Sequence, residues 1–80
     1  MKRVLKIWTP LIFGYWTGGE GEWSSDIRRA VVLEDEDDGA AMWEAYDWFE
    51  ASKEEGEFTD VLELEDDRYD KMVKWANENM

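Results

Sequence analysis

The sequence RVLKIWTPLIFGYWTGGEGEW, residues 3–23, decides the fold. Arg3–Trp8 is rich in the β-branched and aromatic side chains that favour strands, and Leu11–Thr17 is a second run of the same kind. Proline has no N–H to donate within a sheet, so Thr9-Pro10 marks a break or bulge between the two runs. We therefore expect two neighbouring strands near the start of the chain.

The glycine-rich tetrapeptide Gly18–Gly21 predicts the loop of a hairpin. A four-residue loop places Thr17 opposite Glu22 and Trp16 opposite Trp23, and such an aromatic cross-strand pair stabilises a sheet. The tetrapeptide lacks the spacing of a phosphate-binding loop, and its glutamate would repel a phosphate. We interpret it as a turn.

The segment Ile27–Leu33 is rich in β-branched residues and predicts a further strand. Ser25 is also placed to cap a short helix at the same point, which is the alternative. Further along, Ala40 to about Glu55 predicts a helix that Gly56 ends. Its buried stripe consists of Met42, Ala45, Tyr46 and Phe49.

The last third of the chain predicts a strand and a second helix. The inward side of the strand carries Phe58, Leu62 and Leu64, its outward side carries Glu57, Glu63 and Glu65, and Asp60 and Val61 interrupt the alternation. Asp66 or Asp67 then caps a helix with the stripe Tyr69, Met72, Val73 and Ala76. The whole predicts one α+β domain over residues 1–80, with two layers: a three- or four-stranded, mostly antiparallel sheet packed with two helices. It comprises an N-terminal β-hairpin region, 1–33, and an acidic αβα region, 34–80.

The charge is large and uneven. The chain has 21 acidic and 9 basic residues, for a net charge of -12, and residues 34–80 carry all of the excess negative charge. A field of this sign repels nucleic acids and anionic membranes and attracts basic protein surfaces. The alternative is that the acidity only keeps the protein soluble.

Several kinds of site are excluded by composition. The chain has no Cys, so it is not a thiol enzyme or a zinc finger, and it has no His to activate its serine and threonine hydroxyls. Carboxylates are abundant, but 80 residues leave little room for a substrate cleft between them. An EF-hand frame beginning at Glu34 places Ala45 where the bidentate glutamate belongs. We expect no enzyme, no metal site and no cofactor.

Targeting signals are weak. The basic residues before Ile7–Trp16 imitate a secretory signal, but Pro10 interrupts the apolar run and no small-residue cleavage site follows. No apolar stretch approaches the roughly 20 residues that span a bilayer. We therefore expect a cytoplasmic protein.

The candidate partner-binding surface lies in the acidic region. It combines an acidic run, a helix face and one tryptophan: Glu34, Asp35, Glu36, Asp37 and Asp38; Glu44, Asp47, Glu50 and Glu54; and Trp43. At 100° per residue Trp43 falls among these helix carboxylates, where it is either an exposed anchor or packs under the acidic run. Lys53 falls on the apolar side and leaves these helix carboxylates without a basic partner. The second helix, in contrast, has the i, i+4 pairs Asp67–Lys71 and Asp70–Lys74. The other five tryptophans are placed on core-facing sides.

In its size and in these acidic residues, together with Glu57, Glu63 and Glu65, the second half of the chain resembles the small phage-encoded inhibitors that mimic DNA, of the anti-CRISPR and anti-restriction type. The resemblance is one of type, without a shared motif. It implies a non-enzymatic inhibitor that blocks the nucleic-acid-binding groove of a bacterial defence complex in the host cytoplasm. Its partner would be a basic nucleic-acid-binding protein or complex, with no direct binding to nucleic acid, a membrane or a small-molecule substrate.

Two alternatives use the same charge. An immunity protein or antitoxin would cap a cationic nuclease toxin with carboxylates and an aromatic anchor, Trp43 with Tyr46 or Tyr69. An acidic adaptor domain would use the charge for solubility only. Reversing the charges of Glu44, Asp47 and Glu50 separates this last case from both inhibitors.

Overall fold

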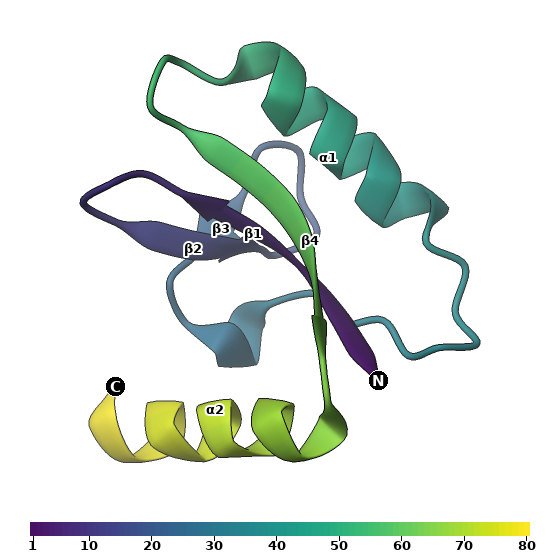
Figure 1. Cartoon of the computed structure of the whole chain (residues 1–80), viewed down its shortest axis with the longest axis vertical. Helices are drawn as coiled ribbons and strands as arrows, with labels where there is room; N and C mark the ends of the chain where they lie inside the picture. Colours follow the sequence, from purple (N-terminus) through teal and green to yellow (C-terminus); the bar gives the residue numbers. More distant parts are fainter.

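The computed structural model describes residues 1–80 as one four-stranded sheet with two α-helices (Figure 1). The elements in chain order are β1 (Lys2–Trp8), β2 (Phe13–Trp16), β3 (Trp23–Ser24), the short 3-10 helix η1 (Ile27–Arg29), α1 (Ala40–Ser52), β4 (Phe58–Leu64) and α2 (Asp66–Asn79). The strand order is β3-β2-β1-β4, and all three pairings are antiparallel. The predicted α+β class is confirmed.

Two consecutive hairpins form one side of the sheet. In the first, the Thr9 hydroxyl accepts the N–H groups of Leu11 and Ile12, so Thr9-Pro10 begins the turn between β1 and β2. In the second, Trp16 pairs with Trp23 as predicted. The glycines at both ends of its loop have positive φ angles, 103° at Gly18 and 69° at Gly21, which glycine adopts without steric cost.

The segment 27–33 is not a strand. It begins as η1, capped by Asp26 and not by Ser25, because the Asp26 carboxylate accepts the Arg28 N–H and also binds the Arg28 guanidinium. Only Leu33 reaches the sheet, where it forms a single antiparallel bridge with Arg3. The Asp26 carboxylate therefore closes a local turn that outweighs the β propensity of this segment.

The two helices lie on opposite faces of the sheet, so the molecule has three layers where the sequence led us to expect two (Figure 1). On the α1 side the core consists of Leu5, Ile7, Trp16, Met42 and Phe49. On the α2 side it consists of Val4, Tyr15, Ile27, Leu64 and Ala76. Because both faces are covered, adjacent residues of β4 are apolar: Val61 packs on the α1 side and Leu62 on the α2 side. This explains the interrupted alternation in β4.

Two helix boundaries and the position of one side chain differ from the predictions. The helix α1 ends at Ser52, before Gly56, and Lys53 is already extended with ψ 148°. Phe58 is 48% exposed and does not point inward as predicted, since it is the first residue of β4. Its ring stacks on Trp8 with the ring centroids 5.7 Å apart. Glu65 occupies the N-cap of α2, so that the two predicted capping aspartates lie in its first turn, where the helix dipole stabilises them. Neither helix is long and apolar enough to cross a bilayer.

Candidate functional site

The acidic run 34–38 is largely engaged by the protein's own N-terminus. The Lys2 ammonium pairs with the Glu34 carboxylate, and the N-terminal amine lies 2.9 Å from the Asp35 carboxylate. The Arg3 guanidinium donates to the main-chain oxygens of Glu34 and Asp37, at 3.2 and 3.1 Å. Two of the five carboxylates are therefore neutralised, and the loop is held beside the start of β1 (Figure 1).

The same contacts set the titration of the two cations. The hydrogen bond to Glu34 raises the pKa of Lys2, and the hydrogen bond to Asp35 raises the pKa of the N-terminal amine. The carboxylates of Asp37 and Asp38 accept main-chain N–H groups within the loop, from Glu34 and Ala40. Of the run, Glu36 alone makes neither a hydrogen bond nor an ion pair, so the loop does not present an open row of five anions.

The helix face is only partly as expected. Glu44 and Asp47 are exposed and have no ion-pair partner, as predicted. Glu50 pairs with Lys53 at 2.8 Å, and this hydrogen bond raises the pKa of Lys53. The prediction that Lys53 would not compensate the face is wrong, because the helix ends before it and its side chain no longer follows the helical wheel. Glu54 lies in the turn to β4, where its N–H donates to Glu57.

The second helix is not self-neutralised. Neither Asp67–Lys71 nor Asp70–Lys74 forms an ion pair, and the acidic residue of α2 that does so is Asp66, 3.4 Å from the N-terminal amine. An exposed i, i+4 pair stabilises a helix by only about 0.3–0.5 kcal/mol, which the entropy of two long side chains offsets. Across the chain five of the 21 acidic side chains form ion pairs, and 16 do not: the five are Asp26, Glu34, Asp35, Glu50 and Asp66.

The tryptophans are far more exposed than predicted. Trp16 alone is buried, whereas Trp48 is 43% exposed and Trp75 60%. Trp43 is 50% exposed; one side of its ring lies beside Gly39 and it packs edge-on against Tyr46, at 5.3 Å between centroids. Three layers built from 80 residues give two thin cores of five buried residues each, which have no room for six indoles.

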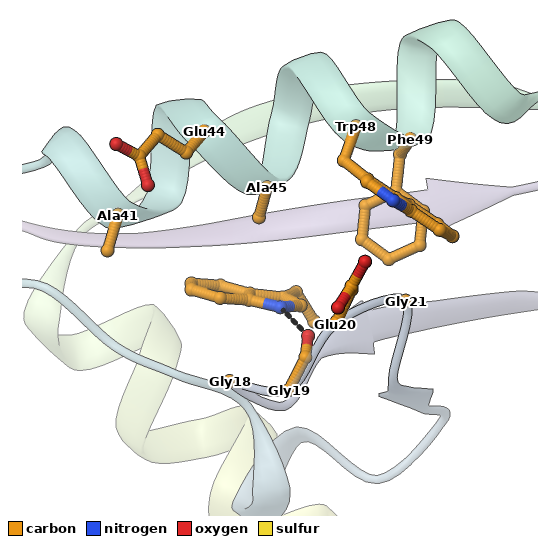
Figure 2. A pocket seen from close by; sticks show the side chains of 10 residues that line it. Gly18, Gly19, Glu20, Gly21, Ala41, Glu44, Ala45, Trp48 and Phe49 are labelled. Atoms are coloured by element: carbon orange, nitrogen blue, oxygen red, sulfur yellow. Dashed lines mark hydrogen bonds between the residues drawn. The ribbon is translucent and has the colours of Figure 1, made fainter.

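A cleft of about 320 Å³ lies between α1 and the Gly18–Gly21 turn (Figure 2). Its walls are Trp16, Gly18, Gly19, Glu20, Gly21, Ala41, Glu44, Ala45, Trp48 and Phe49. The dashed line in Figure 2 is the bond from the Trp16 indole N–H to the Gly19 oxygen, 2.8 Å long. Gly21 lies directly under Trp48, since a Cβ on Gly21 would be 2.7 Å from that ring.

The cleft brings together residues that the sequence analysis kept apart. Glu44 belongs to the predicted partner-binding surface, whereas the sequence predicts only a turn at Glu20 and a core position for Trp48. The small residues Ala41 and Ala45, one helical turn apart, were the available signal, because they leave space beside the helix. Sequence spacing alone does not reveal that the turn carrying Glu20 packs there.

The exposed side chains supply negative charge and aromatic surface. No group of three or more acidic side chains lies close enough together to hold a metal ion. Comparison with protein-family models, with curated proteins and with solved structures finds no match for this chain. The function is therefore argued from the surface itself.

Proposed function

We propose that this protein is a non-enzymatic inhibitor that presents a carboxylate-rich surface as a DNA mimic and blocks the nucleic-acid-binding groove of a basic protein complex, such as a bacterial defence complex. The observation that carries the proposal is the outer surface of α1. There Glu44 and Asp47 are exposed without any basic partner and lie between two half-exposed tryptophans, Trp43 and Trp48. We call these four residues, with Glu20 of the adjacent turn, the acidic face.

The spacing of the charges supports mimicry. Carboxylates three or four residues apart on a helix stand about 5–6 Å from one another. A nucleic-acid strand carries one phosphate per 3.4 Å of helix axis, so a groove lined with Lys and Arg accepts either row of anions. Like charges at this spacing destabilise an isolated helix by a few tenths of a kcal/mol, a cost that binding to a basic partner would offset.

The aromatic rings supply short-range binding energy, which charge alone does not. Long-range attraction accelerates association but adds little affinity once water and salt screen it. Tryptophans are enriched among the residues that dominate the binding energy of protein interfaces. Trp43 and Trp48, which flank the carboxylates, are suited to this role.

The test is competition with DNA. The protein is immobilised and incubated with nuclease-treated bacterial lysate at low salt, and bound complexes are challenged with duplex DNA. We expect a DNA-binding complex that duplex DNA displaces and that is lost as the salt concentration rises. Reversal of the acidic face in Glu20→Lys, Glu44→Lys and Asp47→Lys should abolish its capture.

A control of equal charge change is available. Glu63→Lys, Asp70→Lys and Glu78→Lys reverse three exposed carboxylates that form no ion pair and lie outside the acidic face. This variant should retain the complex. If both triple variants behave alike, the interaction depends on net charge and not on the acidic face, and the proposal fails.

One observation favours a second candidate, an immunity protein or antitoxin. Trp43 and Tyr46 form a compact aromatic pair beside the carboxylates, which suits capping of one small cationic active site. In that case the same experiment recovers a single toxin at one-to-one stoichiometry. The protein would then inhibit the nuclease activity of that purified toxin in the absence of any larger complex.

A further inference from the structure

The cleft beside α1 is lined by apolar side chains and by two carboxylates. The apolar wall consists of Trp16, Trp48 and Phe49 together with the methyl groups of Ala41 and Ala45. The polar groups are the carboxylates of Glu20 and Glu44, which come from opposite sides of the cleft and lie toward its two ends in Figure 2. No basic residue lines it, and neither carboxylate has an ion-pair partner.

The packing of the turn on α1 shapes the cleft. Glycine at position 21 lets the turn approach the Trp48 ring, and Trp48 packs edge-on against Phe49 at 5.2 Å between centroids. The Trp16 N–H is satisfied by Gly19, and its ring is buried at the base of the cleft. The half-exposed Trp48 ring therefore offers the larger aromatic surface to a ligand.

The chemistry of these walls excludes most ligands. An anion would be repelled by both carboxylates. A purely apolar ligand would contact the aromatic wall but make no use of the two carboxylates. A metal ion would find two carboxylates and no third ligand of that kind. A ligand with an apolar stem and a cationic head satisfies both walls.

We infer that this cleft binds one arginine side chain of the basic partner. The inference rests on the proposed function, because it assumes that the partner is basic. A guanidinium is planar and stacks on indole rings, its fork of N–H groups matches a carboxylate, and its stem is apolar. A volume of about 320 Å³ is at the small end of ligand pockets, which suits a single side chain. A lysine ammonium, a strongly hydrated point charge, fits the flat aromatic walls less well.

The test uses the whole protein and a minimal probe, N-acetyl-arginine methylamide, followed by the NMR signals of the tryptophan indole N–H groups. We expect saturable shifts of the Trp16 and Trp48 signals and little change at Trp75, which lies on α2 and does not line the cleft. The lysine analogue should bind at least about fivefold more weakly, and the uncharged citrulline analogue should cause no saturable shift.

Variants locate the site. Glu44→Gln and Trp48→Ala should each weaken the arginine probe about tenfold, which is the typical effect of losing one charge-assisted or cation–π contact. Glu63→Gln, which removes the same charge from β4, should leave the affinity unchanged. Glu44→Gln changes an exposed residue by one atom, so it remains informative even if Trp48→Ala unfolds the protein.

The outcomes separate this inference from the proposed function. If the arginine probe causes no shift, or if citrulline or lysine binds equally well, the cleft is not an arginine site, whatever complex the acidic face captures. If arginine binds here but no DNA-binding complex is captured, the cleft stands as an arginine site and the proposed DNA mimicry falls.

Discussion

Replacing Gly21 by alanine tests how the turn packs on α1, and Gly56 supplies the matched control. Both glycines have positive φ angles, 69° and 89°, and a left-handed conformation costs an alanine about 1–2 kcal/mol at either place. They differ in their surroundings. A Cβ at Gly56 would meet nothing within 4 Å, whereas a Cβ at Gly21 would lie 2.7 Å from the ring of Trp48.

The expected magnitudes follow from that difference. Gly56→Ala should lower the free energy of unfolding by the backbone cost alone. Gly21→Ala should lower it by a further amount of about 0.5–1.5 kcal/mol, the value of one aromatic pair, because the half-exposed Trp48 ring must leave Phe49 to make room. An 80-residue domain is stable by only about 4–12 kcal/mol, so the two variants are easily distinguished.

The assay is urea unfolding followed by far-ultraviolet circular dichroism, since substitutions of tryptophan alter fluorescence directly. When Trp48 is already alanine, Gly21→Ala should cost no more than Gly56→Ala, which corresponds to a coupling of about 0.5–1.5 kcal/mol between positions 21 and 48. Equal losses from Gly21→Ala and Gly56→Ala, with no relief from Trp48→Ala, would refute the packing of the turn on Trp48 and with it the shape of the cleft.

Three further predictions concern the core, the turn before η1 and the acidic face. Met42→Ala should destabilise the fold by about 2–5 kcal/mol in urea unfolding, because Met42 is 2% exposed beneath α1. The hydrogen bond from Arg28 lowers the pKa of Asp26. The stabilisation from this contact should therefore be complete above about pH 4 and disappear as the pH falls through the lowered pKa of Asp26. The difference in melting temperature between the native protein and Asp26→Asn, measured by thermal unfolding, should accordingly shrink in acid. Trp43→Ala should weaken partner binding by at least about 1 kcal/mol in calorimetry with little loss of melting temperature, since only an edge contact to Tyr46 and the side of Gly39 is lost; a collapse of the melting temperature would assign Trp43 to the core.

Local patterns were enough for the elements and for one hairpin register. The two N-terminal strands, predicted within residues 3–8 and 11–17 and observed at 2–8 and 13–16, follow from composition and periodicity, as do the two helical stripes. The pairing of Trp16 with Trp23 follows from loop length. These features depend on residues a few positions apart, where backbone geometry fixes which side chains meet. The segment 27–33 is the exception, because a single side chain, that of Asp26, redirected it.

The state of the candidate site depended on contacts between distant residues. The residues that engage the acidic run, Lys2 and Arg3, are more than 30 positions away from it. Glu50 acquired its partner only because α1 ends early enough to free Lys53 from the helical path. Single ion pairs near the surface contribute little to stability, and the other contacts join distant parts of the chain, so local sequence patterns do not reveal them.

The sequence by itself determined the class of fold, the large negative charge and its concentration after residue 33, since these depend on composition and on short-range spacing. Only the tertiary structure decided which carboxylates remain free. It placed the helices on opposite faces of the sheet and packed the turn carrying Glu20 against Trp48 and Glu44. The physical reason is that a charged side chain is tolerated at almost any surface position, whereas the packing of the core determines which other side chains lie near it.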